Sequence, residues 1–171
     1  MSATITHLKP QKRCKNRVSI YVDDHYAFSI DNSLIIDLRV GQSLSESDIM
    51  ALKTKDERLR AYNQALRYLG LRLRSIVETK QYLSTKGYCL SAIETVIKRL
   101  IKEKYLDDKV FARAWRNDRM RLKPRSARAL GFELKQKGIQ NNIIAEILAD
   151  YDDHQAAWQI VSRKLSQWEN L

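Results

Sequence analysis

Glycine, proline and cysteine are scarce in this chain of 171 residues, which contains five, two and two of them. So few glycines leave little room for a glycine-rich phosphate-binding loop. Cys14 and Cys89 lie far apart and lack the spacing of metal ligands, so we expect no disulfide framework, and a reducing compartment fits. No apolar run is long enough for a signal peptide or a membrane span. We therefore expect a cytoplasmic protein with no membrane partner.

A recognisable catalytic constellation is also missing. The three histidines fall on an expected arm, a turn and a helix start, and none accompanies a nucleophile and an orienting acid. The acidic pairs at residues 107–108 and 152–153 stand at expected helix starts, where capping explains them better than acid–base or metal chemistry. The sequence thus predicts no enzyme, no metal site and no cofactor.

Positive charge is what the chain has in excess. It contains 31 Lys and Arg residues against 20 Asp and Glu, which gives a formal charge of +11. The excess is concentrated between Arg60 and Lys137, while the residues outside this segment, taken together, are slightly acidic. A field of this sign favours a polyanion or an acidic protein surface as the partner, and the alternative is a charge that serves solubility alone.

The N-terminal part predicts a small antiparallel β module. Residues 18–22 and 26–30 alternate apolar and polar side chains around an Asp-Asp-His sequence that is typical of a turn. Residues 34–38 are a candidate third strand, and residues 1–13, which are polar and basic, indicate a loose arm. An isolated hairpin is only marginally stable, so this module should pack on another part of the chain.

Everything after Ser45 predicts helix. A short linking helix is expected first, and a longer helix from about residue 56. Residues 75–78, Ser-Ile-Val-Glu, have the form of a capping box and should open a helix that ends before Gly87. Residues 91–94 resemble a second capping box, followed by an apolar stripe at helical spacing. Asp107 or Asp108 should cap the helix after that.

The helical part repeats itself. The Lys-Gly ending at Gly87 returns at Gly138, an offset of 51 residues that also aligns Leu83 with Leu134. Each unit buries little alone, so neighbouring units should stack. We divide the chain into a β arm (1–44), a linking helix (45–59), two three-helix repeats (60–106 and 107–151) and the first helix of an incomplete third repeat (152–171). The expected fold is mainly α, with tandem three-helix repeats stacked into an elongated array after a short antiparallel β-hairpin or meander.

Cations gather on one face of the central helices. In the helix that begins near residue 108, Phe111, Ala114 and Trp115 share an apolar face and the cations lie opposite. Stacked units would join these cations into a stripe that can follow a phosphate backbone or an acidic protein groove. The alternative is a solvated face without a partner. The predicted basic stripe comprises Arg72, Arg74, Arg113, Arg116, Arg119, Arg121, Lys123, Arg125, Arg128 and Lys135.

Aromatic residues recur along the helices. Most lie on apolar faces, so packing in the core is favoured over stacking on nucleic-acid bases. Phe132 falls near the basic face, and we favour packing against a neighbouring helix over contact with a partner. The residues predicted to pack in the core are Tyr62, Tyr82, Tyr105, Trp115, Trp158 and Trp168, the last two sharing a side with Val161 and Leu165.

Several of these motifs together resemble the RecX family, regulators of the bacterial RecA recombinase. They are the run Tyr-Leu-Asp-Asp-x-x-Phe-Ala-x-x-Trp at residues 105–115, with Arg119 after it, Arg-Ser-Ile-Val-Glu at 74–78, and two Leu-x-x-Lys-Gly endings. The resemblance covers about residues 61–171, and the β arm resembles the N-terminal extension of some longer members. The family usually completes a third three-helix unit, of which this sequence contains only the first helix.

The resemblance implies a role without catalysis. Members of the family bind RecA filaments on DNA, lodge in the helical groove and restrain ATP hydrolysis, strand exchange and repressor cleavage. By this resemblance the chain is an inhibitor that regulates recombination, DNA repair and the SOS response, and we expect a monomer. Its implied partners are the RecA filament and the single-stranded DNA within it. Two other classes stay open: a direct DNA-binding protein of helix-turn-helix type, and an enzyme acting on nucleic acid, for which no metal ligand set is visible.

Overall fold

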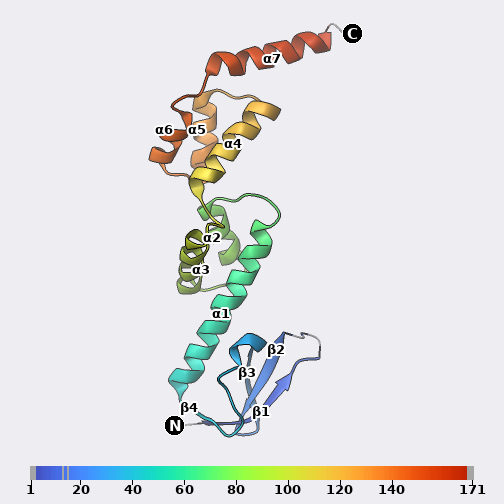
Figure 1. Ribbon diagram of the computed structural model, residues 1–171, viewed down its shortest axis with the longest axis vertical. Coiled ribbons are helices and arrows are strands. Elements are labelled where there is room, and N and C mark those ends of the chain that lie inside the picture. Colours follow the sequence, from blue (N-terminus) through green and yellow to red (C-terminus); the bar gives the residue numbers. More distant parts are fainter. Residues whose placement is uncertain (1–2, 13, 15, 169–171) are drawn as a thin grey trace. The chain divides into compact units, whose positions relative to one another are not determined.

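The computed structural model describes residues 3–12, 14 and 16–168, and within them four strands are followed by seven α-helices (Figure 1). The chain divides into two compact units: an N-terminal unit of residues 1–65 and 87–96, and a C-terminal unit of residues 66–86 and 97–171. The strands are β1 (Ala3–Pro10), β2 (Arg17–Val22), β3 (His25–Asp31) and β4 (Ser43–Leu44), with a 3-10 turn, η1 (Asn32–Leu34), after β3. The helices are α1 (Glu46–Leu69), α2 (Ile76–Thr85), α3 (Leu90–Lys102), α4 (Asp108–Leu122), α5 (Ala127–Gln136), α6 (Asn141–Leu148) and α7 (Asp153–Trp168).

The strands form an antiparallel sheet in the order β3-β2-β1-β4. The predicted hairpin is confirmed: β2 and β3 pair through a turn in which Asp23 and Asp24 have φ of 47° and 64°. Positive φ at both central residues is the requirement of a type I′ turn, whose twist matches that of the flanking strands. Ile5, Ile20 and Ile30 on the inner face of the sheet are fully buried.

Two expectations for this module are wrong. Residues 3–10 are not a loose arm but β1, because Ile5 and Leu8 extend the apolar inner face of the sheet and pair with β2. Residues 34–38 form no strand, because the side chain of Asp31 accepts the N–H of Ser33 at 2.9 Å and starts η1 instead.

Helix α1 is continuous, where the sequence suggested a short helix and a longer one. The side chain of Ser45 accepts the N–H of Asp48 at 3.2 Å, and the Asp48 carboxylate accepts the N–H of Ser45 at 2.9 Å. No glycine or proline follows before Gly70, so nothing in the sequence ends the helix earlier. Ile49 and Leu52 in its first turns pack against the core of the sheet.

Local caps begin and end the helices of the repeats. The capping box at Ser75 and Glu78 is confirmed, and Gly87 and Gly138 follow α2 and α5 with φ of +83° and +79°. The second capping box is wrong, because α3 already begins at Leu90. The N–H of the preceding Cys89 is bound at 2.9 Å by the carboxylate of a residue of α1, Glu57.

The acidic pairs at residues 107–108 and 152–153 each bind the N-termini of two helices of the C-terminal unit. Asp107 caps its own helix, α4, by accepting two backbone N–H groups, and Asp152 does the same for α7. The second aspartate reaches back to the preceding repeat. Asp108 accepts the first N–H of α2 at 2.9 Å, and Asp153 accepts the first N–H of α5 at 2.6 Å. The acidic pairs therefore fix each repeat to the next, as well as capping.

The core of the second repeat contains Phe111, Ala112, Leu134, Ile139 and Ile147. Trp115 packs against it, as predicted.

The prediction of core packing is wrong for two of the aromatic residues. Tyr105 is 55% exposed and Trp158 is 69% exposed. Tyr105 follows Lys104, whose φ is +61°, and the buried residue there is Leu106. In α7 the buried residue is Ala156, and helical periodicity turns the side chain two positions later to the opposite side. Val161 and Leu165 are also exposed, and Trp168 is outside the described side chains.

Candidate functional site

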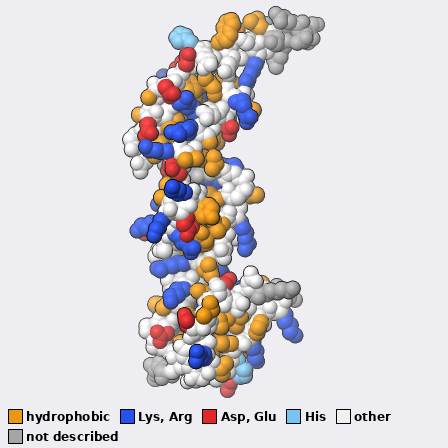
Figure 2. Space-filling model, viewed as in Figure 1, with side chains coloured by type: hydrophobic (Ala, Val, Ile, Leu, Met, Phe, Trp, Pro, Cys, Tyr) orange, Lys and Arg blue, Asp and Glu red, His pale blue; other side chains and the backbone are white. Residues whose placement is uncertain are grey.

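The cations of the predicted basic stripe fall into two groups. Lys and Arg side chains are exposed over the helical repeats (Figure 2), but several others contribute to the fold of the C-terminal unit. The two groups differ in how closely other groups of the same unit hold the charged end of the side chain.

Glu133 of α5 binds cations of the predicted stripe within the C-terminal unit. Its carboxylate accepts the Nε–H of Arg119 at 2.7 Å and the Nε1–H of Trp115 at 2.9 Å, and the guanidinium of Arg125 lies 3.9 Å away. The guanidinium of Arg119 also lies 4.7 Å from the Trp115 ring. Burial raises the pKa of Glu133, but these hydrogen bonds and the charges of Arg119 and Arg125 outweigh it, so the pKa lies below its ordinary value.

Glu78 of α2 is a second internal acceptor. It is 3.2 Å from the guanidinium of Arg72 and 2.8 Å from the ammonium of Lys137 at the end of α5. The hydroxyl of Ser75 donates to the carbonyl of Lys137 at 2.7 Å, so α2 and α5 are joined twice. Burial raises the pKa of Glu78, but the bonds from Lys137, Arg72 and the Ser75 N–H lower it further than burial raises it.

Arg74 and Arg116 are also partly buried. The guanidinium of Arg74 lies 4.1 Å above the ring of Tyr68, which stacks on Tyr82 at 3.8 Å. Arg116 is paired with Asp150 and donates to the carbonyl of Ile147 at 2.6 Å, which joins α4 to α6. Both guanidinium groups therefore contact other groups of the C-terminal unit. A role for these cations in partner binding stays a prediction.

The connection between α4 and α5 presents its cations to solvent. We call Arg121, Lys123, Arg125 and Arg128 the cationic hinge, and all four side chains are exposed. Among the described residues, Arg121 is paired with Asp118, which is 3.7 Å away and itself 67% exposed, and such a surface pair contributes little. Arg113 and Lys135, the other two members of the predicted stripe, are also exposed and lie on α4 and α5.

The backbone of the cationic hinge is held from several sides. Pro124 is buried, and the hydroxyl of Tyr151 donates to the carbonyl of Arg125 at 2.6 Å. Arg163 of α7 donates to the carbonyls of Arg121 and Leu122 at 2.6 and 3.0 Å. Sequence reasoning missed Arg163, because a cation on one helix gives no sign that it will bind the carbonyl end of a helix some 40 positions earlier.

Apolar surface adjoins these cations. Leu122 of the hinge is 66% exposed and Phe132 of α5 is 63% exposed, so the preferred packing of Phe132 against a neighbouring helix does not occur among the described residues. A cavity of about 250 Å³ lies between the segment that precedes α2 and helix α4, with Phe111 and Trp115 in its wall. Its remaining lining residues are Arg72, Leu73, Ala114 and Asp118.

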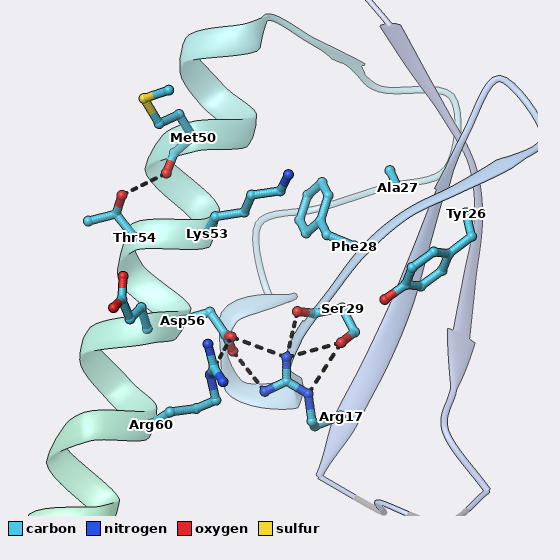
Figure 3. Close-up of a pocket in the computed structure, with 11 residues that line it drawn as sticks. Arg17, Tyr26, Ala27, Phe28, Ser29, Met50, Lys53, Thr54, Asp56 and Arg60 are labelled. Carbon is cyan, nitrogen blue, oxygen red and sulfur yellow. Dashed lines mark hydrogen bonds and ion pairs between the residues drawn. The ribbon is translucent and has the colours of Figure 1, made fainter. Parts of the chain in front are cut away.

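A cavity of the N-terminal unit is of a different kind (Figure 3). It measures about 510 Å³ and lies between α1 and β3. Asp56, only 3% exposed, accepts Arg17 at 3.1 Å, Arg60 at 3.0 Å and the backbone N–H of Asp31 at 2.8 Å. The charged groups at its base thus bind one another and fix the helix to the sheet.

Two further features are absent from the described residues. No three His, Cys, Asp or Glu side chains among them come together as a metal site. No helix within the described ranges is long and apolar enough to cross a membrane.

Three models of a single protein family match the chain in order. The regulatory protein RecX N-terminal domain matches residues 3–45, the first RecX three-helix domain matches 61–100, and the second matches 107–148. These ranges contain the sheet and the two helical repeats. The chain belongs to the RecX family. RecX proteins are regulatory proteins, and the family is not one of enzymes.

Curated RecX proteins align with most of the chain. The regulatory protein RecX of Bacillus licheniformis is 35% identical over 172 residues, which cover 98% of this chain and 65% of that protein. The RecX of Bacillus subtilis (strain 168) is 34% identical over 149 residues, covering 86% of this chain and 56% of its own. The chain spans between 56% and 65% of the length of such relatives.

Solved RecX structures share the fold. One, described as the crystal structure of regulatory protein RecX, superposes with a TM-score of 0.76 at 25% identity and covers 99% of this chain and 85% of the other. The crystal structure of RecX from Lactobacillus salivarius gives a TM-score of 0.60 at 25% identity over 68% of this chain and 77% of the other. The predicted family and the mainly helical fold with an N-terminal antiparallel sheet are confirmed.

Proposed function

We propose that this chain is a non-enzymatic modulator of the RecA recombinase. In this proposal it binds the RecA–DNA filament, inhibits its ATP hydrolysis, and thereby regulates recombination, DNA repair and the SOS response. The observation that carries the proposal is the ordered match to three RecX domains, in a family of regulatory proteins.

The cationic hinge supports the mode of binding. A filament on DNA presents phosphates and acidic side chains, and an exposed cluster of cations is attracted to both. The hinge offers four such cations on a backbone that Tyr151 and Arg163 already hold in place. Ordering a pre-held segment costs little conformational entropy on binding, so more of the electrostatic attraction appears as affinity.

Reversal of the hinge charges tests the proposal. Arg121, Lys123, Arg125 and Arg128 are replaced together by Glu, and inhibition of the RecA ATPase on single-stranded DNA is measured. We expect inhibition to be lost and the fold to survive, because exposed ion pairs contribute only about 0–1 kcal/mol each.

The matched control makes the same change of charge on the first repeat. Its four replacements by Glu are at exposed cations of the same unit, Lys80, Lys98, Lys102 and Lys104. We expect this variant to inhibit nearly as well as the unchanged chain. A folded hinge variant that inhibits equally well would exclude the hinge as the working surface. If the unchanged chain does not inhibit the RecA ATPase but binds naked duplex DNA, and the hinge variant loses that binding, the chain is instead a direct DNA-binding protein.

A further inference from the structure

The outer face of the N-terminal sheet carries a row of aromatic rings. Alternation along β2 sends Ile20 inward and Tyr21 outward. The β2–β3 register is irregular here: Ile20 pairs with Phe28 and Tyr21 with Tyr26, so Tyr26 lies on the side of Tyr21 although Phe28, two residues later, is buried. The register pairs His7 of β1 with Tyr21 of β2, and Tyr21 with Tyr26 of β3. The ring centroids are 6.1 Å apart in the first pair and 6.0 Å apart in the second. Three adjacent strands thus present one ring each.

These rings are accessible where the fold has no need of them. Tyr26 is 58% exposed and the side chain of His7 is 51% exposed, while the apolar core of the sheet lies on the opposite face. Figure 3 shows Tyr26 on β3, where it is one of the residues that line the cavity between α1 and β3. The unit therefore keeps a large aromatic side chain in water.

Cations lie beside the aromatic row. The ammonium of Lys9 is 4.9 Å from the centroid of the Tyr21 ring, and Lys12 beyond the end of β1 is exposed. The sequence from Lys9 to Arg17 contains no acidic residue. The nearest acids already have contacts: Asp23 accepts the N–H of Thr4, and Asp24 lies 3.6 Å from His7.

We propose that this outer face binds single-stranded nucleic acid directly. Bases stack on Tyr26 and its row, and phosphates contact Lys9 and Lys12. Aromatic rings suit this ligand because every base has a π face, and each stacked base adds affinity without a requirement for sequence. A duplex fits poorly, because its bases already stack on one another. A sheet holds its rings in fixed positions, so little order is lost on binding.

The inference goes beyond the proposed function and needs no RecA. The competing account is that cross-strand aromatic pairs only stabilise the hairpin. The two accounts differ at Tyr26, whose exposed ring contributes little to the core. Removal of the ring should abolish stacking and leave the sheet folded, whereas removal of its hydroxyl should change neither.

The test measures the anisotropy of a labelled oligothymidylate of about 15 nucleotides with the whole chain. We expect Tyr26→Ala to weaken binding by at least about fivefold, and Tyr26→Phe to keep it. Tyr105→Ala is the matched control, because that tyrosine is 55% exposed in the other unit, and it should bind as the unchanged chain does. Lys9→Gln should weaken binding and reduce the slope of log affinity against log salt by about 0.7.

Three outcomes would overturn the inference. The first is a folded Tyr26→Ala variant, with an unchanged melting curve, that binds the oligomer with undiminished affinity. The second is an equal affinity for a duplex of the same length, together with binding that is weakened only by the charge reversal of the cationic hinge. The third concerns polyglutamate, an anion without bases, as a competitor of the oligomer. If Tyr26→Ala weakens the binding of polyglutamate as strongly as it weakens the binding of the oligomer, the face is a general anion-binding surface and base stacking is excluded.

Discussion

Gly87 and Gly138 occupy equivalent places in the two repeats and differ in what surrounds them. Both have left-handed backbones, with φ of +83° and +79°. A Cβ built on Gly87 meets no atom within 4 Å, whereas one built on Gly138 lies 2.4 Å from Cγ2 and 2.6 Å from Cβ of Val77. Substitution by Ala therefore separates the backbone requirement from the packing requirement.

The expected losses follow from these two terms. A left-handed backbone costs an L-residue about 1–2 kcal/mol, so Gly87→Ala should lower the free energy of unfolding by about that amount. Gly138→Ala adds an overpacked contact, which costs about 1–3 kcal/mol more, because Val77 Cβ belongs to helix α2 and moves only with its backbone. We expect a total of about 2–5 kcal/mol for Gly138→Ala.

Urea unfolding followed by circular dichroism at 222 nm measures both variants beside the unchanged chain. The Gly138 variant should unfold at clearly lower urea than the Gly87 variant. Equal losses in the two variants would refute the reasoning, because they would mean that only the backbone conformation matters at Gly138 and that α2 does not approach α5 as described.

Two further predictions concern the interior of the C-terminal unit. Trp115→Ala should lower the free energy of unfolding by about 3 kcal/mol, since the ring packs on Phe111 and donates to Glu133, and a variant that melts normally but loses its partner would contradict this. The folded pKa values of Glu78 and Glu133 lie below the ordinary 4.5, so their contribution to stability is present above that pH and is lost as the pH falls through the folded values. Urea unfolding at several pH values should show this loss, Glu78→Gln with Glu133→Gln should flatten it, and an unchanged pH dependence would exclude these two groups as its source. Asp108→Asn should not flatten it, because burial raises the pKa of Asp108 and its charge costs stability as the pH rises.

The features that sequence reasoning predicted correctly involve residues a few positions apart. The Asp23-Asp24 turn, the capping box at Ser75 and the left-handed stop at Gly87 each depend on one short stretch of chain. Their physical causes are steric limits on φ and hydrogen bonds within one turn of helix, and a sequence shows these directly. The 51-residue repeat followed from the same local signals occurring twice.

The features that it missed depend on residues far apart. β1 is a strand because Ile5 pairs with Val22, and the alternation of residues 3–10 alone is too weak to show it. In the basic stripe, helical periodicity separated the cations from the apolar residues only in part: Arg113 and Lys135 are exposed, whereas Arg119 lies over the Trp115 ring. It did not show that Arg119 meets Glu133 from the next helix, since that depends on how two helices pack. The exposure of Trp158 likewise follows from tertiary packing.

Co-sedimentation with RecA filaments tests the central claim most directly. The chain and its two charge-reversal variants are mixed with RecA alone, with single-stranded DNA alone, and with RecA assembled on that DNA. The account predicts that the unchanged chain and the first-repeat control sediment with the assembled filament, and that the variant of the cationic hinge stays in the supernatant. Filament binding by the folded hinge variant equal to that of the unchanged chain, or no binding of the unchanged chain to filaments, would contradict it.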